Sequence, residues 1–217
     1  MAHAQTAASL QLLELAPAPA RPDHAIIAAM VRQGARVLDI GCGDGALLCL
    51  LARERGVRGR GLDLSQANIN ACVAKGLAAV QGDAERELAD FPDAGFDIVI
   101  LAQTIQSLRR PRAVLKQAAR IGARIVVSFA NYGHWRARLG LLTQGRVTPP
   151  PGLTARWCEA DNIHPCSIRD FAELARDMRL GVERAIPLSR GHPGAPFASS
   201  RWRANWFADE AVFLLAP

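Results

Sequence analysis

The chain has 217 residues, of which 50% are hydrophobic and 21% are charged, a balance typical of a globular domain. No run approaches the roughly 20 apolar residues that a membrane-spanning helix needs, and the N-terminus lacks the basic start of a secretory signal. We therefore expect no membrane partner, a disordered tail over residues 1–20 and a single domain over residues 21–217.

The net charge of +6 arises mainly in the C-terminal half. Residues 120–217 carry 13 basic and 8 acidic residues, against 13 and 12 in residues 1–119. This excess would suit an acidic partner, an anionic substrate or nucleic acid. Because no run of five or six like charges occurs, we favour scattered solvated arginines and place nucleic-acid binding last.

Five cysteines, an odd number, favour reduced thiols and a cytoplasmic protein over a disulfide framework. Cys158, His164 and Cys166 have a spacing that suggests zinc. They supply only three ligands and lack the paired C-x2-C hook, so we expect no metal.

From residue 22 to residue 130, apolar periodicity predicts helices that alternate with strands. The strands are near-continuous apolar runs, as in a sheet buried on both faces. In chain order the predicted elements are helix 22–33, strand 35–40, helix 45–56, strand 58–65, helix 66–76, strand 77–83, strand 96–103, helix 111–122 and strand 123–130.

Beyond residue 130 the pattern is less regular. Residues 133–142 are expected to form a helix, residues 143–162 a loop, and residues 189–206 a second irregular stretch. A further helix over 167–178 begins at Ser167, with Asp170 placed to complete a capping box. The last two strands are predicted at 181–188 and 210–216. The whole pattern predicts an α/β fold, doubly wound, with a mostly parallel seven-stranded sheet and helices on both faces.

Four polar side chains lie at the carboxyl ends of four of the predicted strands. They are Asp39, Asp63, Asp83 and Gln103. Since the carboxyl ends of parallel strands meet at one edge of the sheet, where ligands of such folds bind, we expect these residues to line one site.

The segment "GCGDGA" (41–46) matches the dinucleotide fingerprint G-x-G-x-x-G/A. A dinucleotide would place its pyrophosphate beside Asp39 and Asp44, with no Lys or Arg in the turn. S-adenosylmethionine carries a sulfonium and an ammonium instead, which carboxylates favour. We therefore expect S-adenosylmethionine or S-adenosylhomocysteine as the cofactor. The alternative is that both aspartates serve only turn geometry.

Each part of the expected site has a role. Gly41 and Gly43 should take positive φ and let the backbone approach the ligand. Asp63 is placed to accept both ribose hydroxyls, and Asp83 to accept from the adenine amino group. The full expected cofactor-binding set is Asp39, Gly41, Cys42, Gly43, Asp44, Asp63, Leu64, Asp83, Ala84 and Gln103.

Several longer segments resemble one family. The glycine turn with an acidic residue ending the next strand resembles class I S-adenosylmethionine-dependent methyltransferases. "LDIGCGDGALL", "VSFANYGHWRARLGLL", "NIHPCSIRDF" and "FADEAVFLL", in this order, resemble the methionine biosynthesis protein MetW family, over residues 21–216. Ala130 and Pro165 depart from the pattern, as do the loops at 146–158 and 189–206. The resemblance implies a Rossmann-like methyltransferase fold and a homoserine O-acyltransferase as partner.

Whether the chain methylates a substrate stays open. Positioning of donor and acceptor alone can supply on the order of 7–11 kcal/mol, so no catalytic residue is required. Candidates for a base or substrate contact are Asn131, Tyr132, His134 and His164. The alternative is that His134 and Trp135 only anchor a helix.

Two functions therefore remain. The first is a MetW-like protein that binds S-adenosylmethionine and supports or regulates homoserine O-acyltransferase. The second is an active S-adenosylmethionine-dependent small-molecule methyltransferase. The chain itself lacks a G-x-S-x-G nucleophile elbow, so we expect acyl transfer to belong to the partner.

Overall fold

A computed structural model describes residues 21–149, 163–197 and 201–217. The tail predicted over residues 1–20, and most of the loop predicted over 143–162, lie outside the described residues. None of the helices that are described is long and apolar enough to span a bilayer.

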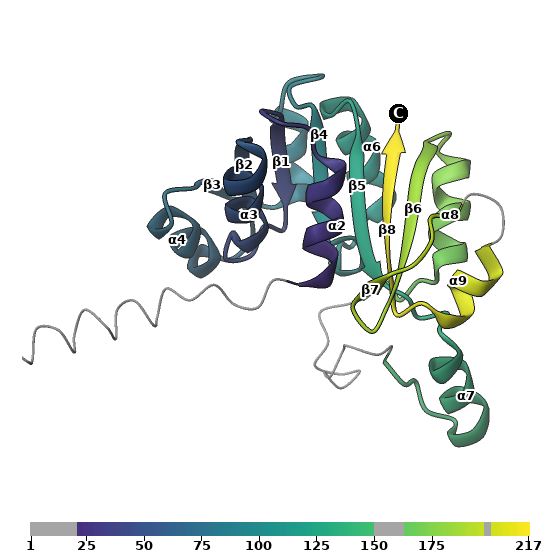
Figure 1. Cartoon of the computed structure of the whole chain (residues 1–217). Coiled ribbons are helices and arrows are strands. Elements are labelled where there is room, and N and C mark those ends of the chain that lie inside the picture. The colour runs from purple at the N-terminus through teal and green to yellow at the C-terminus, as the bar shows by residue number, and fades with distance from the viewer. Residues whose placement is uncertain (1–20, 150–162, 198–200) are drawn as a thin grey trace, which may run out of the picture.

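One mixed sheet organises these residues (Figure 1). Neighbouring strands from β3 to β5 pair in parallel, whereas β8 runs antiparallel to both β5 and β6. The strands lie in the order β3-β2-β1-β4-β5-β8-β6-β7, with bounds β1 (Arg36–Ile40), β2 (Arg58–Asp63), β3 (Ala78–Gln81), β4 (Ile98–Ala102), β5 (Ile125–Ala130), β6 (Gly181–Ser189), β7 (His192–Pro193) and β8 (Glu210–Ala216).

The sheet has eight strands rather than the predicted seven. The additional strand, β7, has two residues and pairs back onto the end of β6. A two-residue pairing is too short to produce the apolar alternation by which strands are recognised. The same stretch, expected to be irregular over 189–206, also contains most of helix α9 (Arg201–Phe207).

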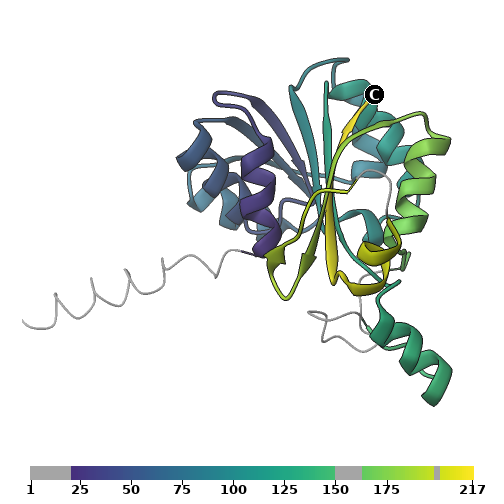
Figure 2. The same cartoon turned by 45° about the vertical axis from the view of Figure 1, so that its right-hand side comes forward.

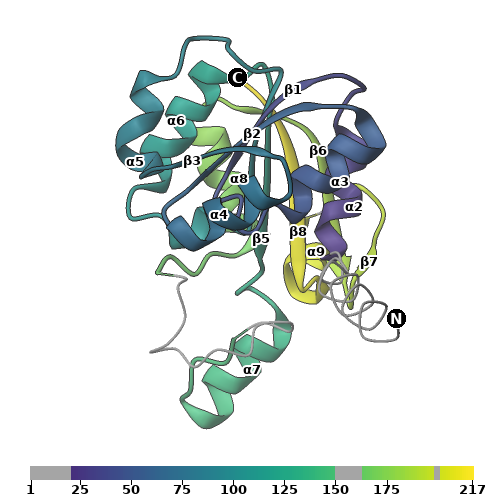
Figure 3. The ribbon, with the colours of Figure 1, turned by 90° about the vertical axis from the view of Figure 1, so that its left-hand side faces the viewer.

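Helices cover both faces of the sheet, as predicted, and Figure 3 shows the two layers edge-on. One core cluster joins α2, α3 and α4 to the sheet, and the other joins α6 and α8 to the opposite face. The helices are α2 (Pro22–Met30), α3 (Ala46–Arg55), α4 (Gln66–Ala74), α5 (Ala84–Glu87), α6 (Pro111–Ile121), α7 (Trp135–Gln144), α8 (Ile168–Asp177) and α9, with short 3-10 turns η1 (Leu88–Asp90) and η2 (Ile105–Ser107).

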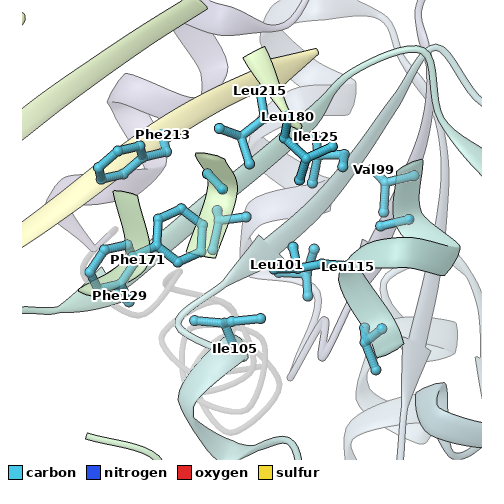
Figure 4. Packing of buried hydrophobic residues seen from close by; sticks show 14 of the residues in the cluster. Val99, Leu101, Ile105, Leu115, Ile125, Phe129, Phe171, Leu180, Phe213 and Leu215 are labelled. Carbon is cyan, nitrogen blue, oxygen red and sulfur yellow. The ribbon is translucent and has the colours of Figure 1, made fainter. Parts of the chain in front are cut away.

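The second core is built around three aromatic rings. Phe171 of α8 lies 4.7 Å from Phe129 of β5 and 4.9 Å from Phe213 of β8, between ring centroids (Figure 4). Burying rings of this size stabilises the sheet against α8. The capping box predicted for α8 is present, since Ser167 Oγ accepts from Asp170 N and Asp170 Oδ2 accepts from Ser167 N.

Helix α7 is the exception to this layered packing. It projects from the end of the molecule at which β5 ends (Figures 1 and 2). It begins two residues later than predicted, because His134 caps it and Trp135 is its first helical residue. Only its small residues Ala137 and Gly140 are buried.

Candidate functional site

Two adjoining cavities lie at the carboxyl ends of β1, β2 and β4. The glycine-turn cavity, of about 230 Å³, lies beside the turn between β1 and α3. The strand-end cavity, of about 730 Å³, opens beside β2 and β4. Both are lined by Arg21, Gly41 and Ala102. Every residue of the expected cofactor-binding set lines one of these two cavities.

The glycine turn has the expected conformation. Gly41 and Gly43 have φ of 73° and 54°, in the left-handed region that favours glycine. A Cβ at Gly43 would meet no atom within 4 Å, whereas one at Gly41 would strike the Thr104 side chain. The turn therefore needs glycine at 41 for space and at 43 for its backbone conformation.

Asp39 is the unusual carboxylate of the turn. It is 1% exposed, and its Oδ1 has no hydrogen-bond partner among the described residues. Burial raises the pKa of Asp39 to about 7; Arg21 opposes this rise, and Asp63 and Asp23 add to it. Because a buried, unpaired carboxylate is unfavourable, a cationic group in the cavity would stabilise it.

Arg21 and His24 also line the glycine-turn cavity, and no motif in the sequence predicts them there. The guanidinium of Arg21 donates to both oxygens of Asp23, at 3.1 and 2.9 Å. His24 Nδ1 has no partner among the described residues, and burial lowers the pKa of His24. A carboxylate and a guanidinium that face the same cavity suit a zwitterionic amino-acid group.

Asp44 behaves differently from Asp39. Its Oδ2 lies 2.7 Å from Lys75 Nζ, and its Oδ1 accepts from Ala46 N. The hydrogen bond from Lys75 lowers the pKa of Asp44. The turn itself contains no Lys or Arg, but Lys75 and Arg21 reach it from other parts of the chain. The charge argument for a cationic ligand rests on Asp39.

Asp63 links the turn to β2. One oxygen accepts from Gly43 N at 2.9 Å, and the other accepts from Ser65 N at 2.9 Å and Asn68 Nδ2 at 3.1 Å. A carboxylate can accept about four hydrogen bonds. Asp63 therefore has room for one further donor in this arrangement, and two ribose hydroxyls would displace a protein donor.

Leu64 and Asp83, which were expected to lie near the adenine, line the strand-end cavity. Leu64 is 69% exposed, and Asp83 caps α5 by accepting from Glu85 N at 2.9 Å. Ala84, the first residue of α5, is buried beside them. An exposed apolar side chain next to a carboxylate suits a base ring with an exocyclic amino group.

Gln103, directly after β4, has φ of 59°, which is uncommon for a residue with a side chain. Its Nε2 donates to Glu210 Oε2 at 2.9 Å. The pKa of Glu210 is raised to about 7, mainly by burial and secondly by the nearby charge of Asp23. Local sequence does not predict Glu210 here, because it reaches this edge on the antiparallel strand β8.

The four candidate catalytic residues line neither cavity. Asn131 is fully buried; its Nδ2 donates to the carbonyls of Asn205 and Ala208, and its Oδ1 accepts from two backbone amides. All four hydrogen-bonding positions of its side chain are occupied, so Asn131 ties β5, α8 and α9 together.

The other three candidates also lie apart. His134 Nδ1 accepts from Arg136 N and its Nε2 lies 3.5 Å from Asp209 Oδ1, an arrangement that anchors α7. Tyr132 lines a separate groove beside α8 and α9. His164 Nε2 lies 3.2 Å from the carbonyl of Arg109. Among the described residues no group of three or more His, Cys, Asp or Glu could hold a metal, and Cys158 lies outside them.

Comparisons with known proteins agree with the resemblance. A relative in Rhodopirellula baltica, named bifunctional methionine biosynthesis protein MetXA/MetW, is 27% identical over 76% of this chain. The chain spans only 28% of that relative's length. A ubiquinone biosynthesis O-methyltransferase of Hahella chejuensis is 34% identical over 68% of this chain and 71% of its own.

Solved structures show the same fold. An S-adenosylmethionine-dependent methyltransferase of Thermotoga maritima, described as a possible histamine N-methyltransferase, superposes with a TM-score of 0.65. It is 15% identical, with 90% of this chain and 87% of that chain covered. The class I methyltransferase fold is thereby confirmed. The family described as methionine biosynthesis protein MetW matches residues 21–215, and the chain belongs to this family.

Proposed function

We propose that this protein binds S-adenosylmethionine in the two adjoining cavities, and that it supports or regulates a homoserine O-acyltransferase of methionine biosynthesis. The observation that carries the ligand assignment is the buried oxygen of Asp39 beside a glycine turn, which no described residue pairs. The Rhodopirellula relative, which joins MetXA and MetW in one name, supports the partnership. We take MetXA to be the acyltransferase that the family resemblance implies.

The residues present fit the proposed cofactor. Asp39 would accept from its ammonium and Arg21 would bind its carboxylate, since both line the glycine-turn cavity. Asp63 would bind the ribose, and Leu64 and Asp83 would receive the adenine. When bound, S-adenosylmethionine supplies an electrophilic methyl group; the residues of the cavities hold and orient it.

The partnership is tested by assaying homoserine acylation with the acyltransferase alone and after addition of this protein, with and without S-adenosylmethionine. We expect the two proteins to co-purify and the acylation rate to change. Asp39→Asn should remove the effect of S-adenosylmethionine, whereas Asp90→Asn, at an exposed carboxylate, should not. The proposal fails if no complex forms and the rate is unchanged.

A second candidate is methyl transfer to a small molecule. The 34% identical relative is named an O-methyltransferase, and the strand-end cavity extends past Gln103 to Ser107 and Arg109, where an acceptor would fit. Formation of S-adenosylhomocysteine that depends on an added metabolite would favour this function. If no metabolite of a broad panel leads to S-adenosylhomocysteine, this result would count against the methyltransferase function.

A further inference from the structure

A second surface, whose groove shares no lining residue with the two cavities, has the composition of a protein interface. It consists of Trp135, Leu139 and Leu142 of α7 with Trp202 and Trp206 of α9, and we call it the α7–α9 surface. The tryptophans are exposed by 36%, 58% and 41% in chain order. An arginine stacks on each, at 5.4, 5.3 and 4.6 Å from the ring. Trp and Arg are the residue types enriched in binding hot spots.

Helix α7 has the reverse of the usual burial pattern. An amphipathic helix buries its large apolar residues, but α7 buries only Ala137 and Gly140. Its leucines Leu139, Leu141 and Leu142 are 47%, 57% and 84% exposed. A projecting helix that displays its leucines has an apolar face for another molecule to cover.

A groove of about 1090 Å³ lies between α7, α8 and α9. Arg138 of α7 bridges it by stacking on Trp206 of α9. The carboxylates that line it are already engaged: Asp170 with Ser167 at 2.8 Å, and Glu173 with Arg169 at 2.9 Å. Asp170 keeps its charge, because Ser167 is neutral, but the lining arginines Arg138, Arg169 and Arg176 outnumber the two carboxylates, so the net charge of the groove is positive.

Charge decides which partner fits. The α7 and α9 segments contain four arginines and no Asp or Glu. A second copy of this chain, docked by two-fold symmetry, would place arginine against arginine. A different protein with an acidic and apolar patch would be complementary.

The groove also accounts for the segments that carry the family resemblance but do not reach the cofactor cavities. "VSFANYGHWRARLGLL" contributes Tyr132 and Arg138 to it, and "NIHPCSIRDF" contributes Cys166 and Arg169. The groove and the two cavities share no lining residue. A partner on this surface would leave the cofactor site accessible.

We propose that the α7–α9 surface is the docking site for the acyltransferase, through an acidic and apolar patch of that enzyme. This inference rests on the proposed function, which names the partner but not the surface. Binding should weaken as salt is raised, because exposed charges are screened.

The test measures the dissociation constant of the full chain for the acyltransferase by calorimetry. Leu142→Glu and Arg203→Glu should each raise this dissociation constant about tenfold or more, and should leave binding of S-adenosylmethionine unchanged. The matched controls are Val73→Glu on α4, at a residue 58% exposed, and Arg53→Glu on α3, with a side chain 73% exposed. Both should bind as the unmodified protein does. Circular dichroism checks that every variant is folded.

The outcomes separate the two proposals. If the unmodified protein does not bind the acyltransferase, the proposed function fails and this surface fails with it. If it binds, but Leu142→Glu and Arg203→Glu bind equally well, only the surface is overturned. If Leu142→Glu converts a dimer of this chain into a monomer and leaves acyltransferase binding intact, the surface is a self-contact, which also overturns the inference.

Discussion

Asp39 and Arg21 give the glycine-turn cavity two opposite charges, the first buried and the second partly exposed. Asp39 Oδ1 has no hydrogen-bond partner in the described part of the chain, and Arg21 is fixed by its paired hydrogen bonds to Asp23. Such an arrangement is favourable for binding and unfavourable for stability, a common trade-off at functional sites. The residues that fix the ligand should therefore be ones whose removal stabilises the empty protein.

Asp39→Asn tests this trade-off. The pKa of Asp39 is raised from 3.8 to about 7, so between these values the folded chain keeps a proton that the unfolded chain has lost. The free energy of unfolding therefore falls as pH rises toward 7 and stays low above it. Asn does not titrate. The free energy of unfolding of Asp39→Asn should therefore exceed that of the unmodified protein by about 1–4 kcal/mol at pH 8, and by less at pH 5. Thermal unfolding at both values checks this; an equal difference at both would contradict it.

Asn131, in contrast to Asp39, is a buried polar residue whose side-chain hydrogen bonds are all made with the protein. Asn131→Ala should lower the free energy of unfolding by about 3 kcal/mol or more, because it leaves buried backbone groups unpaired. Asn70→Ala, on the exposed side of α4, should change it by less than about 0.5 kcal/mol. Unchanged stability of Asn131→Ala would point back to a catalytic role.

At the scale of elements, the turn between β1 and α3 and the end of β2 act as one unit, because Asp63 accepts from the amide of Gly43. The sequence predicted the longer strands and helices from their own apolar patterns, and the glycine positions from their spacing, but it missed β7, α5 and α9. It could not predict that Lys75 of α4 reaches Asp44, or that Arg21 before α2 reaches the cavity. Contacts of that kind depend on how elements pack, which periodicity does not encode.

Asp63→Ala should weaken binding of S-adenosylmethionine by about 1–3 kcal/mol, through loss of the ribose contact and loosening of the turn. Asp63→Asn should weaken it less, since one oxygen can still accept from Gly43 N. Asp177→Ala, with a carboxylate 55% exposed on α8, is the control and should bind normally. Calorimetric dissociation constants measure all three, and equal affinity of Asp63→Ala and the control would refute the assigned role.

At the scale of the whole molecule, the parallel sheet explains why so much of the site was predictable. Asp39, Asp63, Asp83 and Gln103 lie at or just beyond the ends of four strands, and parallel pairing gathers these ends at one edge. Glu210 was missed because β8 enters the sheet antiparallel, so that the start of this strand, rather than its end, reaches the edge. Helix α7 was predicted, but its projection from the molecule was not, and α9 was missed altogether; the surroundings of both helices are set by tertiary packing.

The same architecture places the cofactor cavities and the α7–α9 surface apart, with no lining residue in common between the cavities and the groove. The proposed ligand and the proposed partner would therefore not compete for the same residues.

The central claim is that the glycine turn selects S-adenosylmethionine over a dinucleotide. Titration calorimetry of the full chain against S-adenosylmethionine and against NAD tests it most directly. We predict saturable binding of S-adenosylmethionine that Asp39→Asn weakens, and no binding of NAD. Tight binding of NAD, or failure to bind S-adenosylmethionine, would contradict the claim.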